Sequence, residues 1–265
     1  MLKRNIASRL LIAVASLGLA LPAVASHSWN NYHIARTTSS FTIQYVDSMN
    51  SVWDSTLATA IQKWGQSNVI GFEQVGADDG SRIRRRCPMI SGQMRVCNAA
   101  YGQNGWLGLA TIGLDNQGHI DQGTAKMNDS YDWYWTPAER NHVVCQEIGH
   151  VFGLGHTSED GSSQGTCMDY SSSTSSQWPN AHDYQMIEQI YSHLDSYNSF
   201  TSGSGGGDGG CKGKGCNKPS ITTNVPMGLL VHQHERHAVY VASREDGGYW
   251  VHHVLLAPDR GSSSH

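Results

Sequence analysis

One segment constrains the fold more strongly than any other. It begins at Gln146 and reads Gln-Glu-Ile-Gly-His-Val-Phe-Gly-Leu-Gly-His. Gln146 and His150 are one helical turn apart, so both side chains leave the same face of a helix. Glu147 lies on the adjacent strip. Gly153 lets the chain leave the helix sharply, so that His156 can return toward the same point. A catalytic zinc ion needs three protein ligands and one open position, and this spacing can supply the three.

The sequence also marks where this helix begins. Thr136 and Glu139 have the spacing of a capping box, and Pro137 takes the first helical position. Apolar residues between positions 143 and 152 form the surface that packs into a core. The helix is therefore predicted to begin and end where the metal-binding geometry requires.

The segment resembles the metzincin zinc-peptidase motif H-E-x-x-H-x-x-G-x-x-H, with Gln146 in the place of the first histidine. The resemblance implies a zinc endopeptidase that acts on a protein or peptide substrate, with Gln146, His150 and His156 as Zn²⁺ ligands. It also implies that Glu147 is the general base for a zinc-activated water.

A second motif, Cys167-Met-Asp-Tyr170, supports the same resemblance. Metzincins place a methionine in a tight turn beneath the metal, and Met168 is similar to that residue. Tyr170 stands in the Met-x-Tyr position of the astacin and serralysin branches. This position implies a phenol that approaches the metal or stabilises the oxyanion.

The order of predicted elements resembles the matrixin branch over about residues 40–197. We expect an α/β (α+β) domain with a twisted mixed sheet. The predicted elements are strands at 41–45, 69–75, 106–112 and 119–128, and helices at 53–64, 137–152 and 184–194. By resemblance, the strand at 106–112 is the sheet edge that binds the substrate backbone. The basic run at 82–86 is expected to be a solvated loop.

The first 25 residues have the features of a secretory signal peptide. Lys3, Arg4 and Arg9 precede an apolar run from Leu10 to Leu21, and an Ala-x-Ala site follows at Ala23–Ala25. The run is shorter than the roughly 20 residues that span a bilayer. Cleavage removes three of 18 basic residues and none of 22 acidic ones, which takes the formal charge from −4 to −7. We therefore expect a secreted protein, extracellular or periplasmic, with no membrane anchor and no nucleic-acid partner.

Six cysteines in an exported chain favour disulfides, and six allow 15 full pairings. The simplest arrangement is sequential, with the pairs Cys87–Cys97, Cys145–Cys167 and Cys211–Cys216. The middle pair would tie the zinc helix to the methionine turn.

The composition divides the chain into four parts. The signal peptide (1–25) is followed by the catalytic domain (26–200), a Gly/Ser-rich linker (201–220) and a small β-rich unit (221–260). The last unit contains three predicted strands and a hairpin turn at 244–248. Its histidines match no ligand spacing and are expected to be solvated; they are His232, His234, His237, His252 and His253.

Three interpretations of position 146 stay open. Gln146 can ligate zinc through its amide oxygen, with Tyr170 helping to fill the shell. Another side chain, such as Asp160 or Asp169, can join the two histidines instead. In the third interpretation the site has lost zinc, and the chain is an inactive secreted binding protein. Glu147 has no obvious structural role on its helix, which favours the enzyme.

Overall fold

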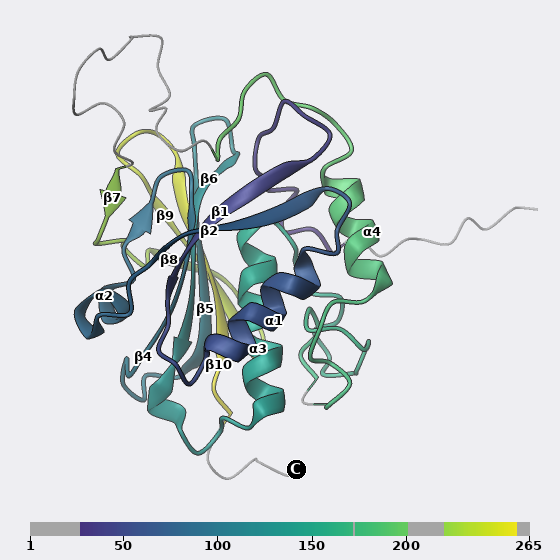
Figure 1. Cartoon of the computed structure of the whole chain (residues 1–265). Helices are drawn as coiled ribbons and strands as arrows, with labels where there is room; N and C mark the ends of the chain where they lie inside the picture. Colours follow the sequence, from purple (N-terminus) through teal and green to yellow (C-terminus); the bar gives the residue numbers. More distant parts are fainter. Residues whose placement is uncertain (1–26, 172, 201–219, 259–265) are drawn as a thin grey trace, which may run out of the picture.

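The computed structural model describes residues 27–171, 173–200 and 220–258 (Figure 1). The predicted signal peptide and the predicted pair Cys211–Cys216 lie outside these residues. The strands are β1 (Phe41–Ser48), β2 (Ile70–Ala77), β3 (Met89–Ile90), β4 (Met94–Ala99), β5 (Trp106–Leu114), β6 (Ile120–Asn128), β7 (Ile221–Thr222), β8 (Leu229–Gln233), β9 (His237–Ser243) and β10 (Tyr249–Leu256). The helices are α1 (Asp54–Trp64), α2 (Ser81–Arg86), α3 (Pro137–Val151) and α4 (Ala181–Ile190), with a 3-10 turn at Asp129–Tyr131.

One mixed sheet of eight strands forms the centre of the molecule, in the order β2-β1-β4-β6-β5-β10-β9-β8. The strands β2, β1, β4 and β6 are parallel to one another, and β5 is antiparallel to β6. The three strands predicted for the C-terminal unit continue this same sheet, because β10 pairs antiparallel with β5 along its length. The expectation that the strand at 106–112 is a free edge is therefore wrong.

Helices α1 and α3 pack together against one face of the sheet (Figure 1). Trp64, at the end of α1, is fully buried and donates its indole N–H to the carbonyl of Cys145 at 3.0 Å. The same ring meets Phe152 edge to face, with the ring centroids 5.0 Å apart. These aromatic contacts fix α3 relative to α1 and to the sheet.

The zinc helix predicted from the sequence is confirmed as α3. Thr136 caps it by accepting a hydrogen bond from the backbone N–H of Glu139, and Pro137 opens it. The chain leaves the helix at Gly153, where φ is +99°. A Cβ at this position would lie 2.0 Å from the carbonyl oxygen of Tyr32, so only glycine fits.

Several elements differ from the sequence prediction. The basic run at 82–86 lies in α2 and is not a loop. The last helix, α4, ends at Ile190, and Leu194 is 58% exposed beyond it. Strand β4 was missed because both of its faces are buried, which removes the alternation that marks a half-exposed strand. Among the described helices, none combines the length and the apolar character needed to cross a membrane.

Candidate metal centre

Helix α3 presents His150 as a neutral imidazole with one free ring nitrogen. The imidazole Nδ1 donates a hydrogen bond to the carbonyl of Leu154 at 2.7 Å, so the lone pair lies on Nε2. That Nε2 atom is buried and has no hydrogen-bond partner among the described residues. Burial lowers the pKa of His150 to about 3, and the uncharged ring is the form that binds a metal.

The turn after α3 brings His156 to the same place. The ring centroids of His150 and His156 are 4.7 Å apart. His156 contacts the hydroxyl of Tyr170 through Nδ1, while its Nε2 is buried without a partner. Burial, together with the neighbouring His253, lowers the pKa of His156 well below its ordinary value. The two histidines predicted from the spacing therefore lie together as neutral imidazoles.

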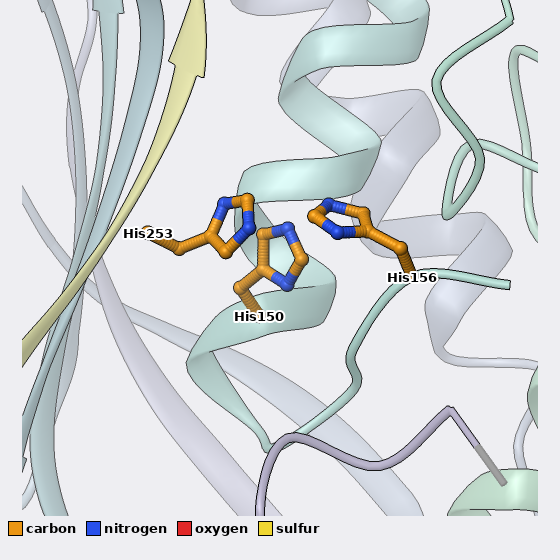
Figure 2. A group of neighbouring side chains, drawn as sticks. All are labelled: His150, His156 and His253. Atoms are coloured by element: carbon orange, nitrogen blue, oxygen red, sulfur yellow. The ribbon is translucent and has the colours of Figure 1, made fainter. Parts of the chain in front are cut away.

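The third imidazole comes from His253 on strand β10, about 100 residues further along the chain. Figure 2 shows His253 reaching from the strand toward His150 on the helix and His156 on the following turn. The ring of His253 lies 4.0 Å from that of His150 and 4.3 Å from that of His156, centroid to centroid. One ligand atom from each of the three lies within 4.8 Å of the others.

The expectation of solvated C-terminal histidines is wrong for three of the five. His253 is 3% exposed, His237 is 1% exposed and stacks on Tyr170, and His252 is 2% exposed. His252 points to the opposite side of β10, where it contacts the Thr111 hydroxyl and the Pro226 carbonyl. His252 and His253 lie on β10, which pairing with β5 and β9 places in the interior of the sheet, whereas His237 begins β9.

Gln146 is fully buried and is held against the methionine turn. Its amide Nε2 donates to the carbonyls of Cys167 at 3.0 Å and Asp169 at 2.9 Å. The amide oxygen Oε1 is buried and accepts no hydrogen bond from the described residues, so it stays available as a further ligand. Zinc ligation by Gln146 remains a prediction.

The acidic substitutes considered from the sequence have other roles. The carboxylate of Asp169 accepts hydrogen bonds from the backbone of Gln164 and Ser171 and from the hydroxyl of Ser176. Asp160 lies in an exposed loop, where it accepts a hydrogen bond from the backbone of Ser162. Neither is among the described groups that gather three metal-ligating side chains.

Glu147 is fully buried between α3 and β5, three residues before His150 on the same helix. Its carboxylate occupies the space above Gly108, where a Cβ would lie 2.2 Å from Oε1. Burial raises the pKa of Glu147 well above its ordinary value, and the backbone N–H of Ala110 opposes this only in part. Ala110 is also the residue opposite His253 in the β5–β10 register. Glu147 and His253 therefore both neighbour Ala110 on β5.

Tyr170 connects two of the imidazoles. Its hydroxyl contacts Nδ1 of His156 and lies 3.3 Å from Nε2 of His253. The side chain is 1% exposed, and burial, together with the charges of Glu159 and Glu147, raises the pKa of its hydroxyl. Tyr170 is therefore a neutral phenol at the edge of the cluster, and its part in catalysis stays a prediction.

The floor of the site is rigid. Met168 is fully buried against α3, and its sulfur would lie 2.6 Å from a Cβ placed at Gly149. A disulfide joins Cys145 to Cys167 and so ties the helix to the turn that carries Met168. A second disulfide joins Cys87 to Cys97. These are two of the three sequential pairings expected from the sequence.

The three imidazoles fit a zinc ion. Each has a buried ring nitrogen without a hydrogen-bond partner among the described residues: Nε2 of His150, Nε2 of His156 and Nδ1 of His253. Buried polar atoms rarely stay unpaired in native proteins, and a bound metal satisfies them. Imidazole nitrogen is a preferred zinc ligand, and three such ligands leave a fourth position open.

The matrixin family model matches residues 28–192 of the chain. The chain is a matrixin. The family is one of zinc metallopeptidases, and the mixed sheet, the helix α3 and the methionine turn agree with it. No curated protein matches the chain. The matched region ends before β8, β9 and β10, so this matrixin draws its third imidazole from outside the matched region.

Spacing alone could not identify His253. A ligand on a strand far along the chain has no fixed offset from His150 and His156. One signal was present in the sequence: position 146 left the site one imidazole short, and histidines on a later predicted strand could supply it. The alternation of a strand also places one of the adjacent residues His252 and His253 on each face.

Proposed function

We propose that this matrixin is a secreted zinc-dependent endopeptidase whose metal is held by His150, His156 and His253. The observation that carries the proposal is the convergence of three neutral, buried imidazoles at the end of the helix that also carries the buried Glu147. His253 replaces the imidazole that the family motif has at the position of Gln146. The two disulfides support secretion, because such bonds persist in oxidising compartments.

Each residue near the three imidazoles has a defined role in peptide hydrolysis. Zinc at this site would polarise the peptide carbonyl and acidify a water molecule. Glu147, whose pKa burial raises, takes the proton of the attacking water and passes it to the leaving amine nitrogen. The neutral hydroxyl of Tyr170 donates a hydrogen bond to the oxyanion that forms from the carbonyl.

One observation favours a second candidate function. Strand β10 pairs with β5 from Trp106 to Leu114, so it fills the edge at which a peptide was expected to bind. A site that stays closed in this way would belong to a catalytically inactive secreted binding protein on a peptidase scaffold. The two functions differ in whether the zinc-loaded full chain cleaves peptides.

Replacement of Glu147 by the isosteric Gln tests the proposal. With a peptide library as substrate, Glu147→Gln should lower kcat/KM by about 100-fold or more, which is the usual contribution of a general base. Zinc content should not change. Glu139→Gln is the matched control, because Glu139 is a buried carboxylate on the same helix. Cleavage that survives Glu147→Gln would remove this residue from the mechanism, and a zinc-loaded native chain that cleaves nothing would favour the binding protein.

A further inference from the structure

A second cluster of histidines surrounds one carboxylate oxygen, and it shares no residue with the site described above. The Nε2 atoms of His33, His119 and His193 lie 3.5, 3.4 and 3.7 Å from Oδ1 of Asp195. His33 precedes β1, His119 lies in the turn between β5 and β6, and the other two residues follow α4. Three distant segments of the chain therefore meet at this oxygen.

A hydrogen bond at Nδ1 of His33 determines which of its ring nitrogens carries the lone pair. Its Nδ1 lies 2.9 Å from the carbonyl of Asn31, to which it can only donate. The neutral ring then carries its lone pair on Nε2, which lies 3.1 Å from Nε2 of His193. It also faces the carboxylate of Asp195, which has only lone pairs to offer.

His119 has the same arrangement. The hydroxyl of Tyr197 donates to the carboxylate of Asp115, so the phenol oxygen is free to accept a hydrogen bond. It accepts from Nδ1 of His119 at 2.8 Å, which again leaves the lone pair on Nε2. Hydrogen bonds of this kind to the outer nitrogen are how proteins orient metal-binding histidines.

Asp195 is prepared to ligate through one oxygen. Its Oδ2 accepts the backbone N–H of Arg36 at 2.9 Å, which leaves Oδ1 facing the three imidazoles.

The spacing of these atoms suits a tetrahedral zinc ion. Zinc–nitrogen bonds of about 2.0–2.1 Å place neighbouring ligand atoms roughly 3.3 Å apart. The distances among the facing atoms of His33, His193 and Asp195 are 3.1, 3.5 and 3.7 Å. A hollow of about 330 Å³, lined in part by His33 and His193, gives an ion access from solvent.

We propose that His33, His193 and Asp195 form a second zinc site with a structural role. One cation between these atoms would accept the lone pairs of the two imidazoles and of Oδ1. His119 lies outside this ligand set and supports the site through the contact of its Nε2 with Oδ1 of Asp195.

This second ion would hold the N-terminal segment in place. Residue Trp29 of that segment donates its backbone N–H to the carbonyl of Gly153 at 2.8 Å. Its ring packs edge to face on His150 and His253, with centroid distances of 5.7 and 5.6 Å. A zinc ion bound at His33 would therefore support a segment that covers the first site.

Zinc stoichiometry of the purified full chain tests the second site. The native chain should bind about two zinc ions, and His193→Ala about one, because each site needs its full ligand set for tight binding. The side chain of His193 is 53% exposed, so its removal leaves the core intact. Gln189→Ala, which lines the same hollow, is the control and should keep both ions.

A companion variant separates the two sites. His156→Ala should lose the first ion and keep the second, and zinc should raise its thermal midpoint. Adding His193→Ala to that variant should abolish the zinc-dependent rise. Equal zinc binding by the native chain and His193→Ala would overturn the second site and leave the first untouched. Loss of all zinc in His193→Ala, with none lost in His156→Ala, would instead support the second site and refute the first.

Discussion

Replacing His253 with alanine is expected to weaken zinc binding at the first site, since it leaves only His150 and His156 of the three imidazoles. Residues that merely orient a zinc ligand contribute about 10- to 100-fold to metal affinity. Loss of a ligand should therefore cost more than about 100-fold, which corresponds to roughly 2.7 kcal/mol or more of binding free energy.

Gln146→Ala should behave differently. Its amide nitrogen donates to two buried carbonyls in the methionine turn, those of Cys167 and Asp169. Each unsatisfied buried carbonyl costs about 1–3 kcal/mol, so the loss of both hydrogen bonds should lower the free energy of unfolding by roughly 2–6 kcal/mol. The disulfide between Cys145 and Cys167 still ties the helix to the turn. Zinc affinity should therefore fall by less than about tenfold.

His252→Ala is the matched control for the strand. His252 adjoins His253 on β10 and is equally buried, but it contacts Thr111 and Pro226 on the opposite side. Zinc affinity of all three variants can be measured by competition with a chelating dye, and circular dichroism checks that each variant is folded. The reasoning is refuted if His253→Ala binds zinc as tightly as His252→Ala. If Gln146→Ala then loses the metal, the amide oxygen is the ligand.

Three further predictions concern the surroundings of the site. Gly108→Ala should lower kcat more than it changes KM, because the new Cβ would lie 2.2 Å from Oε1 of Glu147 and displace the base; steady-state kinetics checks this. Replacing both Cys145 and Cys167 with serine removes a disulfide that closes a loop with a sequence separation of 22. The free energy of unfolding should fall by about 3 kcal/mol, measured by urea unfolding of the metal-free protein. Burial lowers the pKa of Lys126 to about 8. Between about pH 8 and 10.5 the folded state therefore binds fewer protons than the unfolded chain. The free energy of unfolding should rise over that window by no more than about 3 kcal/mol. Lys126→Met should lose that rise, and an unchanged pH profile of unfolding would contradict the assignment.

Local sequence determined the framework of the site. The helix α3, its cap at Thr136, its sharp end at Gly153 and the buried Met168 all follow from short-range rules of spacing and backbone conformation. The pairing Cys145–Cys167 was also among the arrangements expected from the sequence. These features were predictable because each depends on residues that are close in sequence or on a recognisable motif.

Only the tertiary structure decided which residues complete the metal sites. His253 reaches the first site because β10 pairs with β5 in a register that sets it opposite Ala110, next to Glu147. A shift of one residue would turn His252 toward the helix instead, since successive strand side chains point to opposite faces. The cluster around Asp195 likewise depends on three segments meeting, and no local spacing encodes that meeting. Local sequence determines which side chains a helix or turn carries, because helix and turn geometry depends on neighbouring residues. The pairing of distant strands determines which other side chains come to lie beside them.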